Sequence, residues 1–312
     1  MHIIVARPRG FCAGVERAIR SVERALERYG PPVYVLNHIV HNAHVVEALR
    51  ARGAIFVGKV SGVPANAPLL FSAHGVSPER WMEATERDLR IIDATCPLVE
   101  RVHLAARKHA VAGRTVLMIG NAGHDEVIGT VGWAPGKVVI VQNIRDAESV
   151  EVPDPEKVAY ITQTTLSVDD AERIIAILRR RFPKIKGPKQ GDICYATANR
   201  QRAVKALAAR AQLVLVVGDA SSSNSARLAH VAKEQGTKAH LISSAENIEA
   251  AWLENVETIL VTSGASVPED HVQGVIAYFE SRGPCTVEEV CIAEENMHFK
   301  LPEEVREKDP EQ

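Results

Sequence analysis

The chain has 312 residues, 46% of them hydrophobic, so it can bury a large core in one domain or in several small ones. Its formal net charge is −2 and its Lys and Arg residues are scattered, which argues against nucleic acid or an anionic membrane as a partner. It has no apolar run of the roughly 20 residues that span a bilayer, and no signal-peptide core. With five cysteines and no export signal, we expect a soluble protein of the reducing cytoplasm.

The first predicted helix follows Cys12, because apolar residues then recur every three or four positions, as on a helix with one buried face. These positions are Val15, Ile19, Val22, Leu26 and Tyr29. The β-branched run 33–36 predicts a buried strand, and the polar segment 37–42 at its end carries His41. A second strand, beginning at Leu69, runs into a turn that carries His74.

The same order of elements returns after Cys96 and after Cys194. In the first two copies a Val-Glu-Arg triplet follows the cysteine at the same offset, whereas the third copy keeps the helix without the triplet. The two later copies have predicted strands at 116–119 and 213–217, and each strand again ends in a polar tip.

Three copies of strand, polar tip and helix predict an α/β fold of three similar lobes with largely parallel sheets and pseudo-threefold symmetry. We expect the first lobe at residues 1–95, with the C-terminal segment 283–312 packed on it. The second lobe is expected at 96–193 and the third at 194–282. The charged end, 303–312, is expected to be a frayed tail.

Cys12, Cys96 and Cys194 occupy equivalent positions, so a threefold arrangement would bring their thiols to one axis. Their spacing matches no zinc finger, CxxC pair or ferredoxin motif. Three thiolates favour either zinc or an iron–sulfur cluster, and a cluster with three cysteine ligands leaves one iron free to act as a Lewis acid. Cys285 and Cys291 match no repeat position and are expected in the core.

Ligands of open α/β sheets collect beyond the carboxyl ends of the strands. Three histidines lie at such ends in the first two copies, and small polar side chains do so in the third. We interpret them as a cradle for a small anion such as diphosphate, which protonated histidines would strengthen. The residues are His41, His74, His124, Ser222, Ser223, Asn224 and Ser266.

Glu126 and Thr164 each allow two interpretations. In an enclosed site Glu126 can keep a proton near neutral pH and deliver it, but a glutamate in the first turn of a helix can equally be a solvated capping residue. Thr164 can relay a proton or simply hold the turn at the start of a helix.

Short motifs along nearly the whole chain, from Ile3 to about Pro302, carry a family resemblance. They are Pro8–Gly14, Val40–Asn42, Ser72–Gly75, Asp93–Pro97, Gly123–Glu126, Thr162–Ser167, Asp192–Cys194, Ser222–Ser225 and Gly264–Ser266. In this order and spacing they resemble the 4-hydroxy-3-methylbut-2-enyl diphosphate reductases, the last enzymes of the methylerythritol phosphate route to isoprenoids.

The resemblance implies a trefoil of three lobes around a [4Fe–4S] cluster with one open iron. It implies the cluster ligands Cys12, Cys96 and Cys194. The implied reaction is reductive removal of an allylic hydroxyl, giving isopentenyl and dimethylallyl diphosphates, with electrons from an external donor such as flavodoxin or ferredoxin. The implied diphosphate site consists of His41, His74, His124, Ser222, Ser223, Asn224 and Ser266.

By the same resemblance, Glu126 and Thr164 are catalytic and lie at the hydroxyl end of the substrate, which Thr164 also binds. The chain departs from the family pattern at Asp125, where many members have proline. An added carboxylate there can raise the proton affinity of its neighbours. We expect a modest effect, with Asp125 pointing away from His124 and Glu126.

Two rival functions use the same residues. A hydro-lyase with an open iron, like aconitase, would work without reductant, and a non-catalytic iron–sulfur sensor would not need the polar residues at the strand ends. Zinc in place of the cluster is a further alternative.

Overall fold

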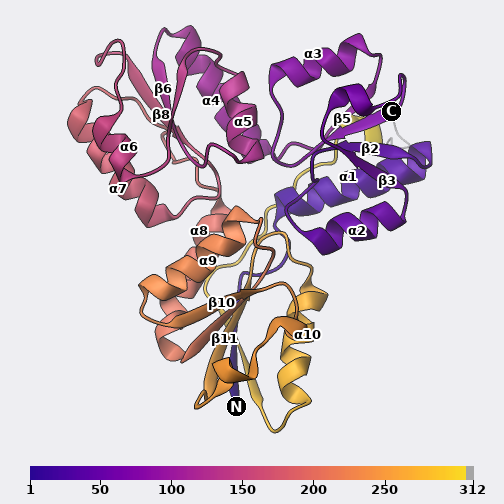
Figure 1. Cartoon of the computed structure of the whole chain (residues 1–312), viewed down its shortest axis with the longest axis vertical. Coiled ribbons are helices and arrows are strands. Elements are labelled where there is room, and N and C mark those ends of the chain that lie inside the picture. Colours follow the sequence, from indigo (N-terminus) through magenta and orange to yellow (C-terminus); the bar gives the residue numbers. More distant parts are fainter. Residues whose placement is uncertain (307–312) are drawn as a thin grey trace.

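The computed structural model describes residues 1–306, and Figure 1 shows them as three lobes around a common centre. Each lobe has its own parallel β-sheet with helices packed against it. The predicted α/β fold of three lobes is therefore confirmed. Within residues 1–306, none of the helices combines the length and the apolar character needed to cross a membrane.

The first sheet has the strand order β3-β2-β4-β5. Its strands are β2 (Val33–Leu36), β3 (Ala54–Val57), β4 (Pro68–Phe71) and β5 (Arg90–Asp93). Its helices are α1 (Ala13–Tyr29), α2 (Ala43–Ala51) and α3 (Pro78–Glu86). The predicted stripe of α1 faces the core: Val22 and Leu26 are buried, and the other stripe residues pack against the same core partly buried. These are Val15, Ile19 and Tyr29.

The second sheet has the order β7-β6-β8. Its strands are β6 (Thr115–Ile119), β7 (Val138–Val141) and β8 (Val158–Thr162). Its helices are α4 (Pro97–Val111), α5 (Asp125–Gly132), α6 (Ile144–Ser149) and α7 (Val168–Arg181). The apolar side chains of β6 and β8 are buried because helices cover the sheet.

The third sheet has five strands in the order β10-β9-β11-β1-β12. They are β9 (Leu213–Val217), β10 (Lys238–Ile242), β11 (Thr258–Ser263), β1 (His2–Arg7) and β12 (Thr286–Cys291). Its helices are α8 (Tyr195–Leu207), α9 (Ser223–Glu234) and α10 (Glu269–Glu280). Short 3-10 helices complete the chain: η1 (Val60–Gly62), η2 (Ala208–Arg210), η3 (Ala245–Asn247), η4 (Ala250–Leu253) and η5 (Glu303–Val305).

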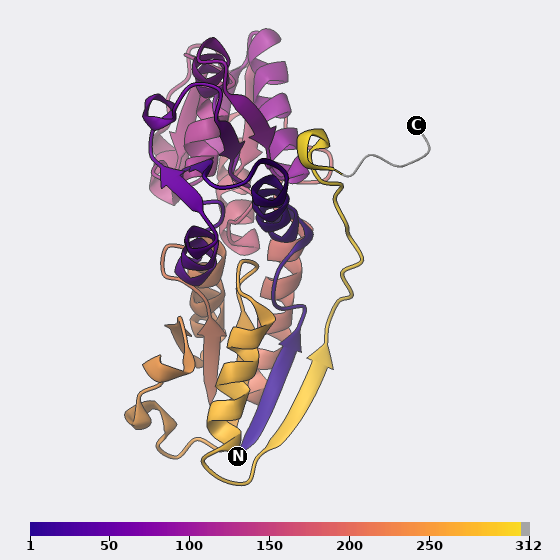
Figure 2. The same ribbon diagram turned by 90° about the vertical axis from the view of Figure 1, so that its right-hand side faces the viewer.

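The position of β1 corrects the predicted lobe boundaries. His2 is in register with Thr258 of β11 on one side and with Thr286 of β12 on the other, so β1 and β12 belong to the third lobe (Figure 2). Residues 3–6 are apolar and almost fully buried, which requires a strand with a neighbour on each side and cover on both faces. A helix-and-strand repeat cannot reveal such a pairing between distant segments.

The segment after β12 runs back to the first lobe (Figure 2). There the Tyr29 hydroxyl donates to the Glu304 carbonyl at 3.1 Å, and Val305 is buried in the core of the first lobe. Of the described part of this segment, 283–306, the stretch from about Lys300 onward thus packs on this lobe. Residues 303–306 are held rather than frayed, and residues 307–312 lie outside the described residues.

The two remaining cysteines differ from the core prediction. Cys285 is half-buried against the core of the third lobe, but Cys291 is exposed. The reason is the place of β12 at the edge of the sheet, where its residues are largely open to solvent.

Candidate functional site

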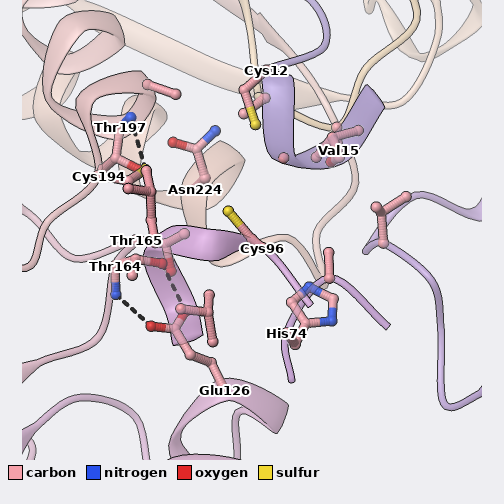
Figure 3. A pocket seen from close by; sticks show the side chains of 18 of the residues that line it. Cys12, Val15, His74, Cys96, Glu126, Thr164, Thr165, Cys194, Thr197 and Asn224 are labelled. Carbon is pink, nitrogen blue, oxygen red and sulfur yellow. Dashed lines mark hydrogen bonds between the residues drawn. The ribbon is translucent and has the colours of Figure 1, made fainter. Parts of the chain in front are cut away.

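The three repeat cysteines each precede a helix and reach one pocket. Cys12, Cys96 and Cys194 have extended backbones directly before α1, α4 and α8. All three line the same pocket between the lobes. Figure 3 shows Cys12 and Cys96 directed into the same space, with Cys194 and Asn224 across it. The positive end of each helix dipole favours a thiolate there.

The residues around the thiols fit a thiolate-bound metal centre. A Cβ on Gly14 would lie 2.7 Å from Cys96 Sγ and 3.9 Å from Cys12 Sγ, so glycine gives these sulfurs their room. Burial, with the nearby Cys12, raises the pKa of Cys96 to about 12 and that of Cys194 to about 11. Thiolates that share one pocket repel one another, and a bound metal or cluster supplies the positive charge that compensates them.

Glu126 lies in the first turn of α5 and is 1% exposed, which excludes the solvated capping role. The backbone N–H of Thr164 donates to Glu126 Oε1 at 2.7 Å, and the Thr164 hydroxyl donates to Oε2 at 2.8 Å. Burial raises the pKa of Glu126 to about 7, outweighing these hydrogen bonds, which lower it. The carboxyl group therefore exchanges a proton near neutral pH.

His41, His74 and His124 meet at one side of the pocket. The ring centroids of His41 and His74 are 4.2 Å apart, and that of His124 lies 5.0 Å from His41 and 5.5 Å from His74. Burial lowers the pKa of all three, that of His124 to about 4. The lowered pKa values favour uncharged rings at neutral pH in the ligand-free protein, so the additional strength that protonated histidines would give an anion site is not present there.

The third lobe supplies one side chain whose polar atoms can serve a ligand: Asn224 is 5% exposed, and neither its amide nitrogen nor its oxygen has a hydrogen-bond partner within residues 1–306. Ser223 lines the pocket beside it. Ser222 and Ser266 also line it but have structural bonds, since Ser222 Oγ accepts from the Ser225 N–H at 3.3 Å and Ser266 Oγ donates to the His41 carbonyl at 3.1 Å.

Every site residue expected from the sequence thus borders this single pocket. The LytB protein family model matches residues 3–280. The chain belongs to the LytB family. This confirms the family resemblance identified from the sequence motifs.

Individual LytB relatives match over nearly their full length. A 4-hydroxy-3-methylbut-2-enyl diphosphate reductase of Acidothermus cellulolyticus is 53% identical over 306 residues, which cover 98% of this chain and 90% of the relative. One of Phenylobacterium zucineum is 52% identical over 303 residues, covering 97% and 96%. The structure of the Plasmodium falciparum E-1-hydroxy-2-methyl-but-2-enyl-4-diphosphate reductase superposes with a TM-score of 0.94 at 39% identity, covering 97% and 96%.

Several pocket residues of this LytB chain were missed from the sequence. Thr197 N–H donates to Cys194 Sγ at 3.4 Å, and its position three residues after the cysteine could have predicted that contact. Thr165 and Tyr195 also line the pocket, beside residues that were identified. Phe299 comes from the segment after β12 and gave no periodic signal.

Asp125 was expected to point away from His124 and Glu126 and to have a modest effect. Its carboxylate reaches the first lobe, where Asn37 Nδ2 donates to Asp125 Oδ1 at 3.3 Å. A ligand atom of Asp125, one of His41 and one of His74 all lie within 4.8 Å of one another. The residue therefore belongs to the histidine side of the pocket, and its negative charge raises the pKa of His41 against the larger effect of burial.

Proposed function

We propose that this chain reduces 4-hydroxy-3-methylbut-2-enyl diphosphate to isopentenyl and dimethylallyl diphosphates in the central pocket. Its LytB relatives are named for this reductase. We assign the reaction to this pocket on one observation. Three thiols, the protonatable Glu126 and the Asn224 amide without a hydrogen-bond partner within residues 1–306 all line the same cavity between the three lobes.

In this proposal Cys12, Cys96 and Cys194 hold a [4Fe–4S] cluster. The close approach of two sulfurs at Gly14 and the convergence of the three thiols on one pocket support a thiolate-bound metal group. When bound, the cluster supplies electrons and, at the iron without a cysteine, a Lewis acid. Zinc has no redox chemistry, so a reductase activity favours the cluster over zinc.

The pocket residues orient the substrate by charge and polarity. We assign the diphosphate to the histidine and third-lobe side, where imidazole nitrogens and the Asn224 amide can donate hydrogen bonds. The residues of this side are His41, His74, His124, Ser222, Ser223, Asn224 and Ser266. The hydroxyl end of the substrate then faces the thiols, and Glu126 and Thr164 lie beside it. Because both ends of the substrate are held, the carbon that loses its hydroxyl is kept in one position in the pocket.

The reaction consumes two electrons and two protons: the C–O bond breaks, water leaves, and a C–H bond forms. Glu126 is the proposed donor to the departing oxygen, since its carboxyl group keeps a proton near neutral pH in an enclosed site. Thr164 donates to Glu126 Oε2 and holds it in position, and its hydroxyl can also contact the substrate.

The electrons must come from outside the chain. We propose an electron donor of the flavodoxin or ferredoxin class and a cytoplasmic location, both on the family resemblance. A reducing compartment would also keep the three ligand thiols free of disulfides.

Anaerobic purification, iron and sulfide analysis and turnover with a chemical reductant test the proposal. Cys96→Ser should lose most of the iron and the activity. Cys291→Ser is the matched control, because that thiol is exposed and does not line the pocket, and it should retain both. An intact, active cluster in Cys96→Ser would contradict the ligand assignment, and turnover without reductant would point to a hydro-lyase.

A further inference from the structure

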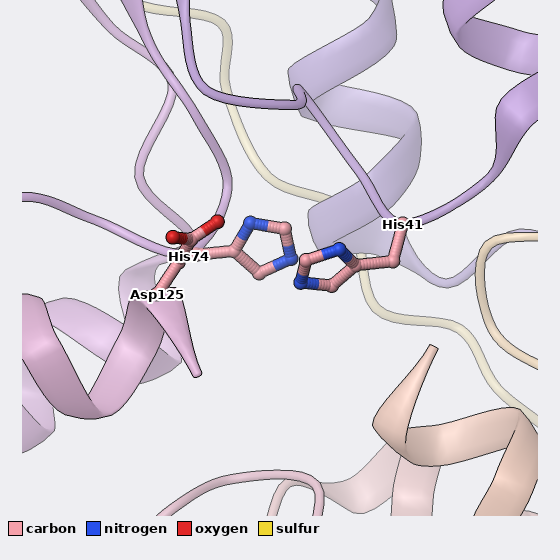
Figure 4. Close-up of side chains that lie close together, drawn as sticks. All are labelled: His41, His74 and Asp125. Atoms are coloured by element: carbon pink, nitrogen blue, oxygen red, sulfur yellow. The ribbon is translucent and has the colours of Figure 1, made fainter. Parts of the chain in front are cut away.

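Two histidines and a carboxylate from different lobes converge on the phosphate side of the pocket. His41 follows β2 and His74 follows β4 in the first lobe, whereas Asp125 opens α5 in the second. One ligand atom of each lies within 4.8 Å of the other two. Figure 4 shows the His74 ring between the Asp125 carboxylate and the His41 ring.

The contacts of these three side chains orient them and leave ligand atoms available. His41 Nε2 is buried and has no hydrogen-bond partner within residues 1–306. Ser72 Oγ lies 3.4 Å from His74 Nδ1, and Asn37 donates to Asp125 Oδ1 at 3.3 Å. A hydrogen bond to the atom that does not bind the ion is the usual support of a metal-ligating histidine or carboxylate.

The chemistry of the three side chains points to a cation. They bring two imidazoles and one carboxylate within 4.8 Å of one another. These are the donors that zinc and similar divalent ions prefer.

We propose that His41, His74 and Asp125 bind a divalent ion of the zinc class at the phosphate end of the pocket, and that this ion and the substrate exclude each other. The exclusion rests on the proposed function, which gives His41 and His74 to the diphosphate. Zinc would then be a competitive inhibitor that acts without touching the cysteine site.

The binding part is tested by titrating Zn²⁺ into cluster-loaded, substrate-free protein in an anaerobic calorimeter. We expect one bound equivalent and an unchanged iron content, which shows that zinc has not replaced iron at the cysteines. Asp125→Asn should weaken zinc binding at least about tenfold. Asp270→Asn, an exposed aspartate of α10, is the matched control and should bind zinc like the unchanged protein.

The competition part uses inorganic pyrophosphate as an unreactive anion. Because diphosphates also chelate zinc in solution, the free zinc concentration is fixed with a metal buffer. Pyrophosphate should then still weaken zinc binding, and zinc should raise KM for the allylic diphosphate, counted as free substrate, without lowering kcat. Absence of zinc binding, equal binding by Asp125→Asn, or simultaneous binding of zinc and pyrophosphate would overturn the proposal. Zinc binding in a protein that fails to turn over would instead leave the metal site standing and count against the proposed function.

Discussion

Thr164 holds both oxygens of the Glu126 carboxyl group, one through its backbone N–H at 2.7 Å and the other through its hydroxyl at 2.8 Å. Glu126 lies in the first turn of α5, in the same lobe in which Thr164 follows β8. The pair fixes a buried acid at the wall of the thiol pocket without ionising it, because burial outweighs the two hydrogen bonds.

Glu126→Gln keeps the size of the side chain and removes its acidic proton. We expect turnover to fall about 10²–10⁴-fold, the usual contribution of a general acid, while iron content and pyrophosphate affinity stay unchanged. Single-turnover kinetics with reduced protein measures the chemical step. Thr164→Ser, which keeps the hydroxyl, should retain most activity. Near-normal turnover in Glu126→Gln would remove it from the role of proton donor.

The pH dependence follows from the raised pKa of Glu126. With a pKa of about 7 instead of the usual 4.5, the acid is protonated at lower pH and loses its proton as pH rises through about 7. Turnover should therefore decline above that pH, and Glu126→Gln should lack this decline. The folded protein also holds a proton that the unfolded chain releases, so the free energy of unfolding due to this group falls between about pH 4.5 and 7. Turnover that stays constant as pH rises through about 7 would contradict the role of Glu126 as proton donor.

Gly14→Ala tests the room for the sulfurs. The new methyl carbon would lie 2.7 Å from Cys96 Sγ, closer than nonbonded atoms approach, so Cys96 must shift. We expect iron content to fall to a minor fraction after anaerobic reconstitution. Gly274→Ala in α10 meets no atom within 4 Å and should keep its iron and gain slightly in stability. Full iron loading of Gly14→Ala would show that the sulfurs do not need this space.

Asn224→Leu separates binding from stability. The amide is buried with no partner within residues 1–306, so its replacement by an apolar side chain of similar size should leave the melting temperature unchanged or higher. Affinity for the diphosphate should fall about 10- to 100-fold, as expected for the loss of one or two hydrogen bonds. Calorimetry with pyrophosphate and a thermal melt measure both. A large drop in melting temperature with unchanged affinity would mean that the amide serves the fold.

The repeat made much of the architecture predictable, because periodic apolar residues and buried strands are local signals. The polar tip carrying His41 and the helix start at Cys96 follow from such signals, since strand ends and helix starts place them at the pocket. The sequence did not reveal long-range partners. β1 pairs with residues more than 250 positions away, and Asp125 takes its direction from Asn37 in another lobe.

The contacts of the fully buried Arg200 could not be predicted from the sequence either. Its guanidinium group donates to the Gly10 carbonyl at 2.8 Å and to Glu295 at 3.1 Å, joining α8 to the loop before Cys12 and to the segment after β12. No periodicity links these three segments. These segments meet only in the folded protein, so their contact is visible only in the three-dimensional structure.

The place of β1 between two strands from the end of the chain has a consequence for synthesis on the ribosome. The four strands of the first sheet are complete once residue 93 has been made, whereas β1 gains its first neighbour only with β11 and its second with β12. At roughly 5–20 residues per second, its apolar residues wait on the order of 10–50 s without a partner. The nascent chain therefore depends on keeping this short segment shielded until translation is almost finished.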